Sequence, residues 1–230
     1  MKAVILAGGL GTRLKPLTHI IPKPLLPVGE KSVLELTVQK LQQQGFEEVI
    51  LAVSYKSDLF ESYFGNGDKF GLKISYSKEE KRLGTAGPVR LARDRLSEPF
   101  LVMNGDILTN LDFTRLRDFH LENDADFTLV TKTIKLPLHY GVVEKQGNRV
   151  LGIREKPVVE SEISAGIYFM NPDAIDTIKP DQKYHMTDLM RDLMAGGKIV
   201  LAYPISDYWL DIGQMDDYNQ AQQDFENGLI

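Results

Sequence analysis

Continuous apolar runs that alternate with helical patterns most constrain the fold of this chain. The stretches KAVILA (2–7), EEVILAVSY (47–55) and PFLVMNGD (99–106) contain unbroken apolar runs, which are typical of strands buried on both faces. Between them, residues 32–45 and 57–65 have apolar side chains at helical spacing. This strand–helix–strand order predicts an α/β fold whose mostly parallel sheet has helices on both faces.

The second half of the chain carries signals of antiparallel strands. Residues 126–134, 140–157 and 163–172 have strand patterns, and the second of these is predicted to form a hairpin that turns at residues 146–148. We therefore expect a single domain over residues 1–230. Its sheet should be Rossmann-like and mixed, mostly parallel and flanked by helices, with a smaller antiparallel portion.

Charge and composition exclude several classes of protein. The formal net charge of −5 argues against nucleic acid as a partner, because such binders usually carry a basic face. The chain has no cysteine, which excludes disulfides, thiolate nucleophiles and cysteine-ligated zinc. No apolar run approaches the roughly 18 residues of a membrane span, and the first apolar run is too short for a signal peptide. We expect a cytoplasmic protein without a membrane partner.

A glycine-rich, basic stretch follows the first predicted strand. Gly8, Gly9 and Gly11 would let backbone N–H groups approach a phosphate closely. Arg13 and Lys23 add positive charge, and the prolines around Lys23 would hold it on a stiff segment. The spacing matches neither the P-loop nor the Rossmann fingerprint. Taken alone, the stretch is equally consistent with a glycine-rich surface turn beside solvated basic residues.

The order of several motifs resembles that of the sugar-1-phosphate nucleotidyltransferases, also called nucleotide-sugar pyrophosphorylases. The resemblance runs over nearly the whole chain and is most like that of guanylyltransferases acting on glucosamine 1-phosphate or mannose 1-phosphate. Some of those relatives add a CBS pair or a C-terminal β-helix, and we expect neither within these 230 residues. The motifs are LAGGLGTRLKPLT…PKPLLPV, LGTAGPV, NGD, YGVVE, EKP, SAGIY and YWLDIG.

The resemblance implies that a sugar 1-phosphate attacks the α-phosphorus of a nucleoside triphosphate and that pyrophosphate leaves. It assigns Asp106 and Asp211 to Mg²⁺, which typically takes one or two carboxylates plus phosphate oxygens and water. Arg13 would stabilise the leaving pyrophosphate, and Lys23 would hold the α-phosphate and the attacking phosphate. Taken singly, each aspartate is equally consistent with a turn or cap residue.

The resemblance also divides the domain. The half over about 1–110 would bind the nucleotide, and the more antiparallel half over about 111–230 would bind the sugar phosphate. There Lys156 would bind the phosphate, and Glu155 would accept hydrogen bonds from sugar hydroxyls. The backbone at three small residues would lie against the sugar, namely Gly141, Ala165 and Gly166. The choice of sugar would depend on two segments expected as loops, 133–140 and 157–164.

For the nucleotide, the resemblance implies a pocket with one informative side chain. Glu79 lies where relatives that use uridine or thymidine nucleotides often carry glutamine. An ionised carboxylate only accepts hydrogen bonds, which suits the two adjacent donors of guanine and favours GTP. Glu79 could also belong to a solvated charge run. The remaining pocket residues would be Leu6, Ala7, Gly8, Gly9, Gly11, Thr12, Gly84, Thr85, Asn104 and Gly105.

Several alternatives stay open at this point. Within the family these are uridylyl, thymidylyl or cytidylyl transfer, and outside it a non-catalytic regulatory subunit that binds a nucleotide sugar. A retaining glycosyltransferase would show an Asp-x-Asp metal motif, and residues 124–126 read DAD. They fall where a predicted helix ends and a strand begins, at the edge of the sheet opposite the motifs above, so we discount this alternative. A homo-oligomer is also an open possibility.

Overall fold

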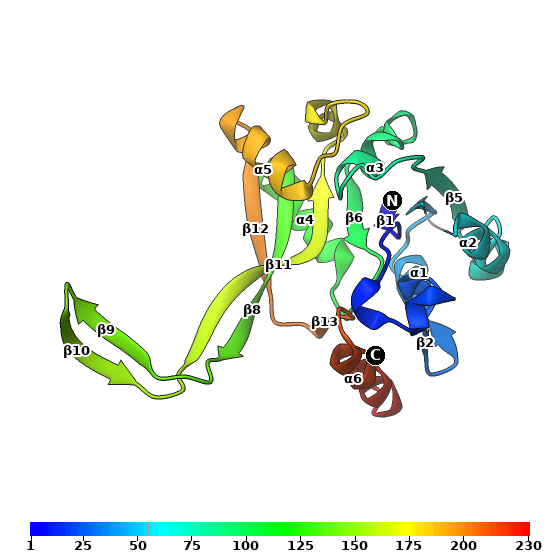
Figure 1. Ribbon diagram of the computed structural model, residues 1–230. Helices are drawn as coiled ribbons and strands as arrows, with labels where there is room; N and C mark the ends of the chain where they lie inside the picture. The colour runs from blue at the N-terminus through cyan, green and yellow to red at the C-terminus, as the bar shows by residue number, and fades with distance from the viewer. Residues whose placement is uncertain (55) are drawn as a thin grey trace.

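The computed structural model describes residues 1–54 and 56–230; Tyr55, which ends the strand predicted over 47–55, lies outside the described residues. A seven-stranded sheet forms the centre of the molecule, in the order β12-β8-β11-β6-β1-β4-β5 (Figure 1). Only β11 runs antiparallel to its neighbours in this sheet, so the predicted mixed, mostly parallel fold is confirmed. The strands are β1 (Lys2–Leu6), β4 (Glu48–Val53), β5 (Lys73–Lys78), β6 (Phe100–Asn104), β8 (Phe127–Pro137), β11 (Val158–Met170) and β12 (Val200–Ile205).

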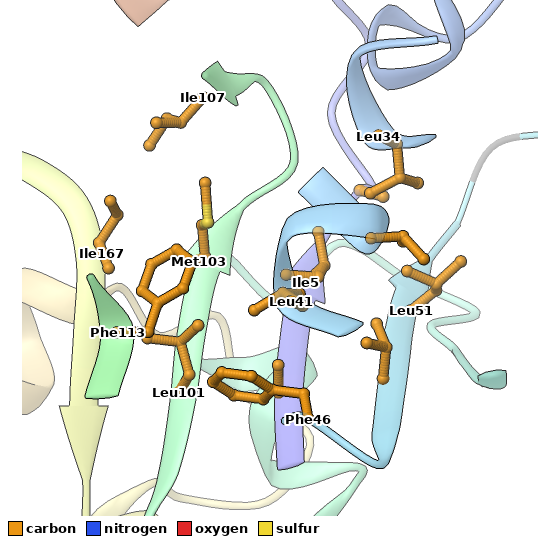
Figure 2. Close-up of a cluster of buried hydrophobic side chains, with 14 of the residues drawn as sticks. Ile5, Leu34, Leu41, Phe46, Leu51, Leu101, Met103, Ile107, Phe113 and Ile167 are labelled. Carbon is orange, nitrogen blue, oxygen red and sulfur yellow. The ribbon is translucent and has the colours of Figure 1, made fainter. Parts of the chain in front are cut away.

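Helices cover both faces of this sheet. On one face, helices α1, α2 and α4 pack on the outward side chains of the central strands. Figure 2 shows part of this layer, with Ile5 of β1 and Leu101 of β6 lying against Leu41 of α1 and Phe113 of α4. Helices α3 and α5 cover the opposite face. The helices are α1 (Val33–Gln43), α2 (Ser57–Phe64), α3 (Gly87–Arg90), α4 (Phe113–Glu122), α5 (Met186–Ala195) and α6 (Met215–Glu226).

No helix in the described part of the chain combines the length and the apolar character that a membrane span requires.

The helix predicted over 32–45 begins where Ser32 accepts a hydrogen bond from the Glu35 N–H at 3.1 Å, as an N-cap does. It ends before Gly45, whose φ of +78° is a conformation that glycine adopts without strain. The capping residues therefore fix α1 at both ends.

Three short antiparallel pairs complete the fold. Strands β7 (Ile107–Thr109) and β13 (Trp209–Asp211) join residues that are far apart in sequence. Strands β2 (Pro27–Val28) and β3 (Lys31–Ser32) form a small pair beside α6. Strands β9 (Val142–Gln146) and β10 (Arg149–Arg154) form the predicted hairpin, which turns at Gly147–Asn148.

The segments 133–140 and 157–164 are mostly strand, and the expectation that they form loops was wrong. The outer parts of β8 and β11 continue as a paired ladder from Thr133↔Glu162 to Pro137↔Val158. This ladder extends beyond the main sheet and carries the β9–β10 hairpin away from it (Figure 1). Alternating polar side chains allow such a ladder to form in water, although they lack the apolar run that marks a buried strand.

The carboxyl ends of β1, β4 and β6 meet at one edge of the sheet, where ligands of open α/β sheets bind. The DAD sequence lies just before β8, at the opposite edge. Its Asp126 accepts a hydrogen bond from the Ile199 N–H at 2.9 Å and pairs with Lys198 at 3.1 Å. Asp126 therefore has a structural role, which agrees with discounting an Asp-x-Asp metal site.

Candidate active site

The glycine-rich segment crosses the carboxyl end of β1 as a tight loop. Neighbouring strands fix its start, because Ala7 donates to the Ala52 carbonyl at 2.8 Å and Gly105 donates to the Leu6 carbonyl at 3.0 Å. Gly11 has a φ of +59°, and a Cβ there would lie 2.7 Å from Cγ2 of Thr18. Both the backbone conformation and the available space therefore require glycine at this position.

A buried lysine lies between two carboxylates next to this loop. The Lys23 side chain is held on a 3₁₀ turn that begins after Pro22, and only 8% of Lys23 is exposed. Its Nζ lies 2.5 Å from Oδ2 of Asp106 and 3.6 Å from Oδ1 of Asp211. The antiparallel pairing of Asp211 with Ile107 places the second carboxylate beside the first.

The charge balance at this cluster is incomplete. Oδ1 of Asp211 is buried and has no hydrogen-bond partner within the described ranges, 1–54 and 56–230. Burial raises the pKa of Asp211, and the negative charge of Asp106 raises it further, whereas Lys23 and Arg13 oppose the shift. An additional cation would give this oxygen a closer partner than Lys23, which lies 3.6 Å away. The part of the chain that the structure describes has no cluster of three or more His, Asp or Glu at which a metal would be held by protein alone.

Two cavities adjoin the glycine loop. The smaller, about 240 Å³, is lined by Arg13, Lys23 and Asp106. The larger, about 490 Å³, opens along the same loop toward Glu79. Because the two cavities share part of the loop and Asp106, a ligand with a charged end and a flat end can occupy both. The predicted residues that line one or both are Leu6, Gly8, Gly9, Gly11, Thr12, Arg13, Lys23, Glu79, Gly84, Thr85, Asn104 and Asp106.

Other predicted residues lie behind or beside these cavities. Ala7 is buried in the core, and Gly105 is buried under the loop. Ala165 accepts a hydrogen bond from Nε1 of Trp209 at 2.8 Å. Gly166 lies against Asn104, because a Cβ there would be 2.6 Å from the Asn104 amide nitrogen. Gly166 therefore lies behind Asn104, which lines the larger cavity, and neither Ala165 nor Gly166 lines the cavity itself.

The structure does not bring the remaining predicted residues to these cavities. Gly141, Glu155 and Lys156 lie where the outer ladder joins the β9–β10 hairpin (Figure 1). Glu155 and Lys156 are exposed there, and the Glu155 carboxylate lies over Gly141. Lys156 has a φ of +44°, so the EKP motif forms a tight turn.

Glu79 belongs to the wall of the larger cavity, whereas its neighbours Glu80 and Lys81 are exposed. Its Oε2 accepts a hydrogen bond from the Leu83 N–H at 3.0 Å. Its Oε1 faces Gly8, because a Cβ on that glycine would lie 2.6 Å from it. Glu79 is therefore held in the cavity wall, unlike the exposed charged residues Glu80 and Lys81 next to it.

Sequence reasoning missed a second segment of the cavity wall, at residues 183–185. Lys183 and His185 line the larger cavity. Between them, the Tyr184 N–H donates to the Leu83 carbonyl at 2.8 Å, and the Tyr184 carbonyl accepts from Ala86 at 2.9 Å. No local motif marks this contact, which joins residues about a hundred positions apart. The available signal is Gly84, whose φ of +86° indicates a close backbone approach.

We expect the substitution Gly84→Ala to destabilise the fold and weaken nucleotide binding. A Cβ at this position would lie 2.4 Å from the Tyr184 carbonyl oxygen, in addition to the strain of a positive φ. Gly45→Ala is the matched control, because Gly45 has a φ of +78° and open space around its Cβ position. Strain alone costs about 1–3 kcal/mol, so chemical denaturation should show a larger loss for Gly84→Ala than for Gly45→Ala. Equal losses would contradict the importance of the Tyr184 contact.

The family model described as "Nucleotidyl transferase" matches residues 2–228. A UTP–glucose-1-phosphate uridylyltransferase of Synechocystis sp. is 39% identical over 96% of this chain and 62% of its own length. A mannose-1-phosphate guanylyltransferase catalytic subunit beta of Dictyostelium discoideum is 37% identical over 100% of this chain and 66% of its own length. The chain thus spans less than two thirds of these relatives.

Solved structures share the fold over nearly their full length. A putative glucose-1-phosphate thymidylyltransferase from Bacillus anthracis, in complex with a sucrose, superposes with a TM-score of 0.79 at 26% identity, covering 97% of this chain and 94% of that one. HddC from Yersinia pseudotuberculosis, complexed with GMP-PN, superposes with a TM-score of 0.77 at 28% identity, covering 97% of this chain and 99% of that one.

Proposed function

Because the chain belongs to the nucleotidyl transferase family, we propose that it transfers a nucleoside monophosphate from a nucleoside triphosphate, preferably GTP, to a sugar 1-phosphate. The observation that carries this proposal is the buried Lys23 between Asp106 and Asp211, at the end of a glycine-lined cavity. This arrangement concentrates both signs of charge where a triphosphate and its counter-ion would meet.

The proposed reaction needs positioning and charge neutralisation more than proton transfer. A phosphate oxygen of the sugar 1-phosphate is ionised at neutral pH, attacks the α-phosphorus and displaces pyrophosphate, so no general base is required. Backbone N–H groups of the loop around Gly9 and Gly11 would bind phosphate oxygens. Arg13 would neutralise the leaving pyrophosphate, and Lys23 would orient the α-phosphate and the incoming one.

We propose Mg²⁺ as the cofactor, held by Asp106 and Asp211. The buried Oδ1 of Asp211, which accepts no hydrogen bond, fits a cation, and Mg²⁺ commonly takes only one or two carboxylates and completes its shell with phosphate and water. When bound, the ion would neutralise charge on the phosphates. Lys23 would keep the two carboxylates together before substrate arrives.

For the sugar phosphate we propose the half over about 111–230 of the single domain. Gly166 supports this assignment because it packs against Asn104, which lines the larger cavity. Lys156 and Glu155 would reach the reacting phosphate only if the outer ladder of β8 and β11 bends toward the cavity. The pairing of β8 with β11 shifts register between Ser164 and Tyr168, which gives the ladder a place to bend.

We propose GTP as the preferred nucleotide because Glu79 lines the larger cavity and is anchored there, with one oxygen on the Leu83 N–H and the other beside Gly8. Substitution of Glu79 by glutamine should lower kcat/KM with GTP by about 10- to 100-fold, since an amide cannot accept both donors of guanine. The same change should raise the relative activity with UTP. Glu80→Gln is the control, because Glu80 is exposed next to Glu79.

The measurement is pyrophosphate release with GTP, UTP, dTTP, CTP and ATP, each tested against a panel of hexose, hexosamine and heptose 1-phosphates. A wild-type preference for UTP or dTTP would keep the reaction class and overturn the role of Glu79. The names of the Synechocystis and Bacillus anthracis relatives make uridylyl and thymidylyl transfer the alternatives. The regulatory-subunit alternative predicts no turnover with any nucleotide, and the presence of Arg13, Lys23 and both aspartates argues against it.

A further inference from the structure

The β9–β10 hairpin, hereafter the ribbon, has an apolar surface that the rest of the described chain leaves open. It projects from the sheet at the end of the outer ladder (Figure 1). Val143, Val150, Leu151 and Ile153 are 50%, 63%, 61% and 66% exposed. None of the four belongs to the three buried apolar clusters found among residues 1–54 and 56–230.

The strand register places Val143, Val150 and Ile153 on one face of the ribbon. Val143 is opposite Ile153, and Lys145 is opposite Val150, so these residues alternate onto the same side. The register shifts between Val150 and Gly152, which leaves Leu151 as the extra, exposed residue of a bulge. The three apolar side chains and Lys145 form a strip along this face.

The charged side chains of the ribbon lie on its opposite face or at the two ends of the apolar strip. The opposite face carries the ion pair between Glu144 and Arg154, at 3.0 Å. The apolar face is bounded at the hairpin turn by Lys145. It is bounded at the ladder by Glu155. The Glu155 carboxylate and the Ile153 side chain both lie over Gly141, on the same side of the backbone. The strip thus has a cation at one end and an anion at the other.

We propose that this face docks on the same face of a second copy of the chain, with the two ribbons antiparallel about a two-fold axis. Such an arrangement places Lys145 of each copy beside Glu155 of the other and buries both apolar strips. A two-fold contact requires this kind of self-complementary surface. A two-stranded hairpin alone is only marginally stable in water, so a second layer also explains how the ribbon keeps its form. The proposal does not depend on the transfer reaction itself, but it assigns Glu155 to the contact between copies, so a docked ribbon would not bring Glu155 to the sugar.

The first test is the oligomeric state of the full chain in sedimentation experiments. We expect the wild type to be a dimer at micromolar concentration and Ile153→Asp to be a monomer with an unchanged circular dichroism spectrum. Gln146→Asp is the matched control, because it introduces the same charge on the opposite face of the ribbon, and it should remain a dimer. A monomeric wild type, or a dimer that survives Ile153→Asp, would overturn the proposal.

A second test uses the absence of native cysteine, which makes any introduced thiol unique. Val143 lies midway in sequence between Lys145 in β9 and Gly141 just before it, so the two-fold axis should pass close to it. Under mild oxidation, Val143→Cys should form a covalent dimer at least about tenfold faster than Glu144→Cys, which points the other way. Equal rates for the two variants would also overturn the proposal, because they would indicate random collision.

Discussion

Replacement of Lys23 by methionine should lower the kcat for pyrophosphate release by about 10²–10³-fold, the range measured when a fixed electrostatic group is removed from an active site. Methionine retains most of the volume but removes the only charge that lies between Asp106 and Asp211 within the described chain. The two carboxylates then repel each other and the incoming triphosphate. Since the proposed role of this charge is to orient the reacting phosphates, kcat should fall more than KM rises.

The control for this variant is Lys15→Met, because Lys15 is an exposed lysine in the same segment of the chain. Circular dichroism should show that both variants are folded, and the control should keep wild-type kinetics. Activity of the Lys23 variant within about tenfold of the wild type would remove Lys23 from the reaction, because that ratio corresponds to only about 1.4 kcal/mol. The buried lysine would then be a structural pair for Asp106.

The substitution Asp211→Asn should have opposite effects on activity and stability. Turnover should fall by about 10²–10³-fold because one of two carboxylate ligands for the metal is lost. Stability without ligands should rise, since burial and Asp106 raise the pKa of Asp211 and thus make its ionised form costly in the folded state. Each 1 kcal/mol gained would raise Tm by about 2–4 °C in a domain of this size.

The raised pKa of Asp211 also determines how the stability difference between wild type and variant changes with pH. A raised folded pKa means that the wild type gains stability as pH falls and Asp211 takes up a proton. The advantage of the asparagine variant should therefore be present at neutral pH and disappear in acid. Adding Mg²⁺ and GTP together should raise Tm for the wild type and much less for the variant. An asparagine variant that is stabilised as much as the wild type would exclude Asp211 as a metal ligand.

Local patterns predicted the sheet and the loop but not the contacts between distant segments. The apolar runs identified β1, β4 and β6, because strands buried on both faces leave a continuous signal. Gly8, Gly9 and Gly11 marked the loop because a close backbone approach needs glycine. The pairing of β7 with β13, which brings Asp211 to Asp106, has no local signal, and the resemblance alone placed both aspartates on a metal.

Two further features were not predictable for physical reasons. Residues 183–185 reach the larger cavity through backbone hydrogen bonds to the segment around Gly84, and backbone contacts leave little trace in side-chain patterns. The outer ladder of β8 and β11 carries polar and apolar residues without a buried face. Such a strand resembles a loop when only the sequence is considered, although its ladder of hydrogen bonds is regular.

The short β7–β13 pair also sets the order in which the candidate site can be assembled during synthesis. Lys23 and Asp106 leave the ribosome more than a hundred residues before Asp211. At elongation rates of about 5–20 residues per second, that interval lasts about 5–20 s. During it, the nascent chain holds one lysine and one carboxylate, whose charges cancel. Translation itself therefore delays completion of the cluster of Lys23, Asp106 and Asp211 until most of the chain has been made.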